Sequence, residues 1–211
     1  MGQKIHELAE QGVQVVVTTH SPAFINMLHL EGMAVLRKEN GATRAIQLSR
    51  EDLSQYCTEH GATRVTADTV LPFYAAAATE EILSGFFARQ IVLVEGATEA
   101  LALPVYLHQV GLDVTREGIA IIPVHGVGNL AKWWRLFTAH DIPTYVIYDN
   151  DSNDDSNGAR RIDLLSTLSV SQDRLEQLLQ AEDWLVEDSF AVFGIDYERT
   201  AIIYLTLCTP G

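Results

Sequence analysis

The stretch Ile91-Val92-Leu93-Val94-Glu95-Gly96-Ala97-Thr98-Glu99 decides the fold of this 211-residue chain. Its four leading apolar residues predict a buried parallel strand, and Gly96 permits a tight turn into a helix that begins near Thr98. Glu95 then ends the strand and Glu99 lies in the first helical turn, close to it. One interpretation of both acids is structural, because carboxylates interact favourably with a helix N-terminus. The other interpretation is a binding or catalytic site.

The alternation of strand and helix continues along the chain and predicts an α/β fold, with a parallel sheet flanked by helices. In such sheets the functional groups collect beyond the carboxyl ends of the strands. Strands are expected at residues 91–94, 119–123, 144–148 and 201–208, and helices at 98–110, 129–140 and 175–181.

A second acidic motif, Asp149-Asn150-Asp151, directly follows the strand at 144–148. Alternate residues of an extended chain point the same way, so Asp149 and Asp151 can face one site while Asn150 faces away. With Glu95 and Glu99 they would bring four carboxylates to one sheet edge, where cations relieve the repulsion. Carboxylate oxygens suit Mg²⁺ and Mn²⁺, and two such ions can clamp the attacking and leaving oxygens of a phosphodiester.

Two further acidic features have competing interpretations. An EF-hand loop starting at Asp149 is rejected, because Asp154 stands at the sixth position, where Gly is needed, and Arg160 at the twelfth, where Glu is needed. Glu187 and Asp188 lie within an apolar frame, and for each a helix N-terminus or exposed turn has the same weight as a functional role.

The first 88 residues have a different pattern. Residues 13–19 are nearly all apolar and predict another buried parallel strand, which His20-Ser21-Pro22 ends before a new helix. Strands are expected at 33–38 and 43–48 around a hairpin turn, and a helix at 74–89, whereas 49–70 have no clear assignment. We place a domain boundary near residue 88.

Composition limits the partners and the compartment. The chain has a formal net charge of −14, which opposes nucleic-acid binding unless its carboxylates converge on divalent cations. No apolar run approaches the roughly 18 residues of a membrane span, and two cysteines in no metal-type spacing suit a reducing compartment. We expect a soluble cytoplasmic protein without a membrane partner.

The segment from Phe86 to Glu99 closely resembles the start of the Toprim domain in nucleases of the OLD (overcoming lysogenization defect) family. Toprim domains share a Glu-Gly after the first strand and an Asp-x-Asp after a later one, which Glu95-Gly96 and Asp149-Asn150-Asp151 match. Glu99 resembles the OLD version of the second acid, and residues 121–129 resemble the family's middle section. Glu187 resembles a later acidic position.

The N-terminal segment is similar to a second domain type. Residues 15–22, with Thr19-His20-Ser21 at their centre, resemble the final core strand and switch histidine of an ABC-type ATPase, and OLD proteins have the order ATPase then Toprim. The resemblance implies an incomplete ATPase portion at 1–88, and a Toprim catalytic domain at 89–211 that is either complete or truncated at its C-terminus.

The resemblance implies a bacterial, metal-dependent DNA endonuclease with a role in phage defence. Catalysis and the binding of two Mg²⁺ or Mn²⁺ ions would fall to Glu95, Glu99, Asp149 and Asp151. Glu187 would be a fifth metal ligand and Asp188 a less favoured one, while Arg160 and Arg161 would attract DNA. His20 would sense ATP, and the ATPase region would form a homodimer, only in a full-length protein.

Two departures from the family keep alternatives open. The sequence has no G-x-x-x-x-G-K-[ST] phosphate loop, and no lysine after Lys132 to serve as the family's C-terminal active-site lysine. The alternatives are an inactive Toprim fragment, or another Toprim activity such as that of an RNA-maturing nuclease or a primase.

Overall fold

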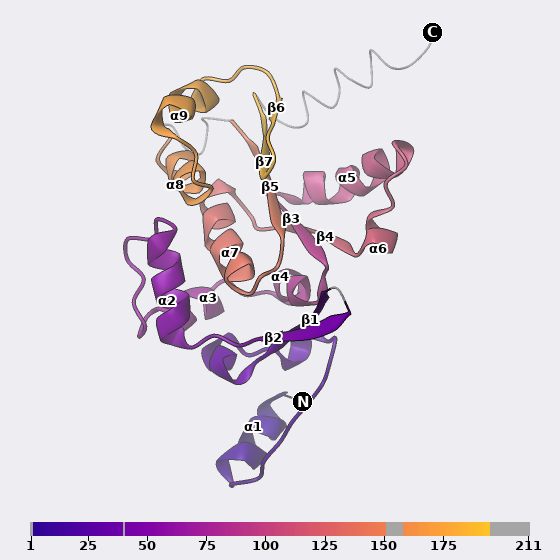
Figure 1. Ribbon diagram of the computed structural model, residues 1–211, viewed down its shortest axis with the longest axis vertical. Helices are drawn as coiled ribbons and strands as arrows, with labels where there is room; N and C mark the ends of the chain where they lie inside the picture. Colours follow the sequence, from indigo (N-terminus) through magenta and orange to yellow (C-terminus); the bar gives the residue numbers. More distant parts are fainter. Residues whose placement is uncertain (1, 40, 151–157, 195–211) are drawn as a thin grey trace.

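The computed structural model describes residues 2–39, 41–150 and 158–194. Helix α1 (Gly2–Glu10) stands apart at the N-terminal end, and the central sheet occupies the opposite half of an elongated molecule (Figure 1). The expected strand at 201–208 lies outside the described residues.

The central sheet has five strands in the order β4-β3-β5-β7-β6. Neighbouring strands pair in parallel from β4 to β7, and only β6 runs antiparallel to β7, so the α/β prediction is confirmed. All three strands predicted within 91–148 are present. The bounds are β3 (Gln90–Val94), β4 (Ile119–Pro123), β5 (Thr144–Asp149), β6 (Leu185–Val186) and β7 (Phe190–Phe193).

Helices cover both faces of this sheet, with α5 and α6 on one side and α7 and α8 on the other (Figure 1). Helix α7 supplies much of the core, because Trp133, Leu136 and Phe137 are fully buried against β3 and β5. The bounds are α5 (Ala97–Gln109), α6 (Val114–Glu117), α7 (Val127–Ala139), α8 (Ala159–Thr167) and α9 (Gln172–Leu179).

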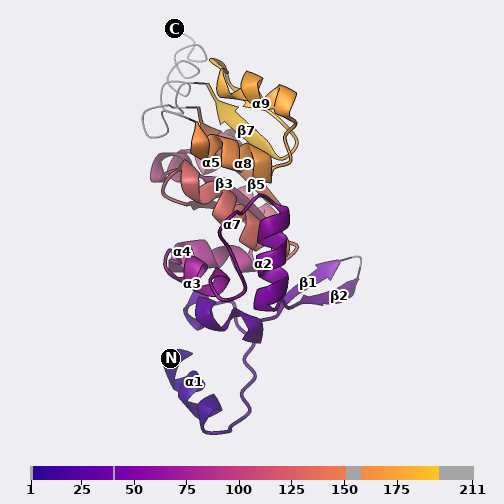
Figure 2. The same ribbon diagram turned by 90° about the vertical axis from the view of Figure 1, so that its left-hand side faces the viewer.

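The residues before the sheet form short elements that pack beneath it. The predicted hairpin is confirmed as β1 (Val35–Glu39) and β2 (Ala42–Ile46), which projects from the side in Figure 2. The other elements are the 3-10 helices η1 (Pro22–Phe24), η2 (Met27–Gly32) and η3 (Ser84–Phe87), and the α-helices α2 (Arg50–Glu59), α3 (Val70–Ala75) and α4 (Glu80–Leu83).

Two predictions for this region are wrong. Residues 13–19 form no strand, and Val16 is 85% exposed. A buried parallel strand needs neighbours on which to place its backbone hydrogen bonds, and no strand of the described residues pairs with this segment. The predicted helix at 74–89 is interrupted after Ala75, because Thr79 caps a new helix by accepting from the backbone N–H of Ile82.

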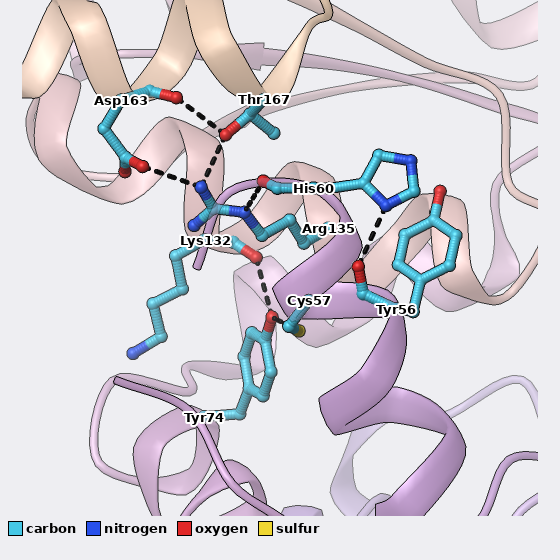
Figure 3. A network of polar contacts seen from close by, with 8 residues as sticks. All are labelled: Tyr56, Cys57, His60, Tyr74, Lys132, Arg135, Asp163 and Thr167. Carbon is cyan, nitrogen blue, oxygen red and sulfur yellow. Dashed lines mark hydrogen bonds and ion pairs between the residues drawn. The ribbon is translucent and has the colours of Figure 1, made fainter. Parts of the chain in front are cut away.

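A buried polar network joins α2 to the helices on the sheet (Figure 3). Arg135 of α7 donates to the carbonyl of His60 at 2.8 Å, to the carboxylate of Asp163 at 2.8 Å and to the hydroxyl of Thr167 at 2.5 Å. The Arg135 side chain is almost fully buried, so these bonds satisfy guanidinium donors that have little access to water, whereas the Asp163 carboxylate is 45% exposed. The network fixes α8 relative to α2 and α7.

Candidate metal site at the sheet edge

The carboxyl ends of β3 and β5 are joined by one side chain. Glu95 follows β3, and its Oε1 accepts a hydrogen bond of 2.7 Å from the backbone N–H of Asp149, the last residue of β5. The carbonyl of Glu95 accepts from Gly126 N at 2.9 Å, which adds the loop after β4. The two acidic motifs therefore meet at one sheet edge, as their positions after parallel strands predict.

Glu99 lies in the first turn of α5, as predicted, and is 5% exposed. A β-carbon at position 96 would stand 3.2 Å from its Oε2, so the glycine lets this carboxylate come close to the turn that begins at Glu95. Burial of an ionised carboxylate is costly unless it is paired. The position of Glu99 at the helix N-terminus and its closeness to Gly96 agree with both interpretations of this acid.

The acids present are hard oxygen donors, which suit Mg²⁺ or Mn²⁺ rather than a soft metal. Within the described ranges, no three His, Cys, Asp or Glu side chains form a group that could hold a metal ion. Asp151, the fourth predicted ligand, lies outside the described residues. The donor chemistry thus fits a hard divalent cation, while the described carboxylates do not complete its coordination.

Glu187 and Asp188 lie at the other end of the strands. The backbone N–H of Glu187 donates to Phe190, which pairs with Val146 at the amino-terminal half of β5. Three residues of strand, about 10 Å, separate Val146 from Asp149. Glu187 is instead ion-paired with Arg174 at 2.6 Å. The structure does not bring this pair of acids to the edge that holds Glu95.

A pocket of about 320 Å³ that the sequence did not predict lies next to the Glu95 backbone, whose carbonyl accepts from Gly126 in the pocket lining. The loop after β4 shapes it, since Gly126 adopts φ +113° and the Asn129 side chain donates to the carbonyls of Val124 and His125. Most of its lining comes from the segment 121–129, whose sequence indicates a function only by its resemblance to the OLD family. The lining residues are His125, Gly126, Gly128, Asn129 and Arg160.

The two arginines of α8 differ from each other. Arg160 is exposed and lines the pocket, which agrees with the expected attraction for an anion. Arg161 is 5% exposed and donates to the carbonyl and the side-chain oxygen of Asn150. The expectation that Arg161 attracts DNA directly is therefore wrong, because its guanidinium is directed into the protein.

The structure also shows the surroundings of two other polar side chains, Tyr148 next to the site and His20 in the N-terminal segment. Burial raises the pKa of the Tyr148 phenol well above its usual range, and the Glu95 carboxylate adds to the shift, so this phenol stays protonated. His20, the predicted switch histidine, is exposed and stands edge-on to Phe87 with ring centroids 5.9 Å apart.

Comparison with known proteins agrees with this geometry. Residues 86–151 match the family model described as the Toprim domain of overcoming lysogenization defect protein-like proteins. The chain is 26% identical over 161 residues to the Old nuclease of Escherichia phage P2, covering 76% of this chain and 26% of that protein. It is 26% identical over 138 residues to the OLD nuclease of Thermus scotoductus (strain ATCC 700910 / SA-01), covering 65% of this chain and 25% of that protein.

The chain thus spans about a quarter of the length of the curated relatives it matches. Among solved structures, the C-terminal region of the Burkholderia pseudomallei OLD protein is 28% identical, with a TM-score of 0.42, over 53% of this chain and 56% of that one. Among the helices that the structure describes, none has the length and apolar character needed to cross a membrane.

Proposed function

Since the chain belongs, through residues 86–151, to the OLD-like Toprim family, we propose that it holds the catalytic site of a metal-dependent nuclease that cleaves DNA. The hydrogen bond from the Asp149 backbone to the Glu95 carboxylate carries this proposal, because it unites the two acidic motifs at one sheet edge. The relatives named as nucleases support the reaction class.

Four carboxylates would hold one or two Mg²⁺ or Mn²⁺ ions, namely those of Glu95, Glu99, Asp149 and Asp151. A bound ion of this kind lowers the pKa of a water molecule and stabilises a leaving oxygen. Glu95 also fixes the backbone of Asp149, so its carboxylate has a positioning role besides that of a ligand. Arg160, exposed in the adjoining pocket, would contact a phosphate of the substrate.

A nicking assay on supercoiled plasmid tests the proposal. Glu95→Gln and Asp149→Asn keep the shape of each side chain and remove its charge, and Asp188→Asn is the matched control, because that exposed acid lies at the opposite end of the strands. We expect Mg²⁺ or Mn²⁺ to support nicking by the wild type and by the control, and each site variant to lose at least about 100-fold in rate. Equal nicking by all four proteins would refute the assignment.

The same proteins separate the second candidate function, an inactive chain with an intact metal site. That candidate predicts no nicking, together with a Mn²⁺-dependent rise in melting temperature that Glu95→Gln abolishes. A labelled structured RNA in the same assay distinguishes DNA cleavage from the RNA-maturing alternative.

For residues 1–88 we propose the end of an ABC-type ATPase domain, with His20 as its switch histidine. This rests on the resemblance of residues 15–22. ATP and a homodimer formed through this region would belong to the whole protein. Calorimetry on this chain alone is expected to show no ATP binding, and measurable affinity would contradict the division proposed here.

A further inference from the structure

Arg161 is a buried cation with a specific set of partners. Its side chain is 5% exposed, and Nη1 donates to the carbonyl oxygen of Asn150 at 3.0 Å and to Oδ1 of the same residue at 2.6 Å. A guanidinium taken out of water is stable only when its donors are satisfied, and here Nη1 donates to two acceptors of the same residue. Two hydrogen bonds of Arg161 therefore go to Asn150, the middle residue of the acidic motif.

Asn150 in turn binds three separate parts of the chain. Its Nδ2 donates to the carbonyl of Leu179, the last residue of α9, at 3.1 Å, and to that of Ala181, just beyond the helix, at 3.0 Å. Its backbone N–H donates to the carbonyl of Phe193, the last residue of β7, at 2.7 Å. With Arg161 added, all the polar groups of Asn150 are engaged, and the residue is only 9% exposed.

We propose that Arg161 and Asn150 form a positioning unit that fixes the carboxyl end of β5 and thereby holds Asp149 beside Glu95. Asn150 lies on the opposite side of the extended chain from the Asp149 side chain, so it can be anchored in the protein while the acid faces the site. The N–H, carbonyl and side chain of Asn150 are bonded to β7, α8 and the end of α9, so this residue cannot turn without breaking these bonds. Arg161 acts through Asn150, as a positioning residue.

The consequence for metal binding rests on the proposed function. Removing a group that orients a metal ligand typically weakens metal binding about 10- to 100-fold. Loss of the Arg161 guanidinium should therefore weaken Mn²⁺ binding by about that factor, although Arg161 itself touches no metal. The effect on the backbone is measured separately from metal affinity, through the amide hydrogen bonds of Asp149 to Glu95 and of Asn150 to Phe193.

The experiment compares Arg161→Gln with Arg135→Gln in the full chain. Arg135 is an equally buried arginine, 5% exposed, that also donates to a backbone carbonyl, but its partners are His60, Asp163 and Thr167. Both variants lose stability, so each is measured under conditions in which urea titration shows it folded. Hydrogen exchange of the Asp149 and Asn150 amides is read by NMR, and Mn²⁺ affinity by electron paramagnetic resonance.

We expect Arg161→Gln to speed exchange of these two amides about tenfold or more relative to Arg135→Gln, and to weaken Mn²⁺ binding about 10- to 100-fold. Asn150→Ala should have the same effects, and the double variant with Arg161→Gln should add little, because both changes break one unit. Unchanged exchange at Asp149 and Asn150 in Arg161→Gln would overturn the positioning role. Faster exchange in a chain whose wild type binds no Mn²⁺ would leave that role standing and refute the proposed metal site.

Discussion

Gly85 stands where three elements of the core meet. A β-carbon at this position would lie 2.8 Å from Cζ of Phe137, and 2.9 Å from Cδ1 of both Ile122 and Ile91. Carbon atoms in favourable contact are about 3.5–4.0 Å apart. The three neighbours are at most 1% exposed and come from α7, β4 and β3, so none can move aside into solvent. Gly85→Ala should therefore push η3 away from the sheet.

Two opposing effects determine how much Gly85→Ala lowers the free energy of unfolding. Overpacking in a well-filled core typically costs about 1–3 kcal/mol. Replacing glycine by alanine lowers the conformational entropy of the unfolded chain, which stabilises the folded protein by about 0.4–1 kcal/mol where the native backbone is compatible. The net loss in the free energy of unfolding should be about 1–2 kcal/mol. For a chain of this size each kcal/mol lowers the melting temperature by about 2–4 °C, so we expect a decrease of roughly 2–8 °C.

Urea unfolding followed by circular dichroism measures this loss, with Gly32→Ala as the matched control. Gly32 also lies in a 3-10 helix, but a β-carbon there would meet no atom within 4 Å. The control should be as stable as the wild type, or more stable by up to about 1 kcal/mol. If Gly85→Ala matches or exceeds the stability of Gly32→Ala, the packing around η3 described here is wrong.

Three further changes test other parts of the structure. Ser49→Ala removes the hydroxyl that accepts from the backbone N–H of Asp52 in the capping box of α2, and should lower the free energy of unfolding by about 1 kcal/mol in the same urea assay. Burial raises the pKa of the Cys57 thiol, so iodoacetamide should modify this residue only after the protein unfolds. Peptide mass spectrometry measures the modification, and rapid labelling of the native protein would contradict the burial of Cys57. Burial lowers the pKa of His140, so the unfolded state binds the proton more tightly, and the free energy of unfolding should fall as pH decreases below about 6.5. In urea titrations between about pH 5 and 7.5, the His140→Gln variant should show a weaker dependence of this free energy on pH.

The strands that carry the site were readable from sequence because their signals are local. The predicted strand at 119–123 agrees with β4 at both ends, since its apolar run follows Gly118 and ends in Pro123. Helix α2 also had a local signal, the Ser49-x-x-Asp52 capping box, which the sequence reasoning overlooked. Strand β7 had none of comparable strength, because a four-residue strand is defined by its pairing with β5 rather than by its own pattern.

The residues of the candidate site also differ in how far the sequence could predict their positions. Glu95 and Asp149 could be brought together from sequence because Glu95 directly follows a strand and Asp149 lies at the end of one, and the carboxyl ends of parallel strands share an edge. Glu187 could not be placed, since its position depends on the reversal of the chain between β6 and β7. The role of Arg161 was equally hidden, because an arginine beside a loop has the same appearance in sequence whether it faces solvent or the protein.

The net charge of −14 understates how few positive charges can reach DNA, because some of the cations are buried. Of the 14 lysines and arginines, Lys132, Arg135 and Arg161 are almost fully buried, and all three donate to backbone carbonyls within the protein. Positive charges used in this way release no counterions from DNA, which is the main source of nucleic-acid affinity. If the chain cleaves DNA as proposed, its own attraction for the substrate must therefore come from bound cations and a few exposed arginines such as Arg160. The affinity of this chain for DNA should then depend more on the concentration of divalent metal than on the concentration of monovalent salt.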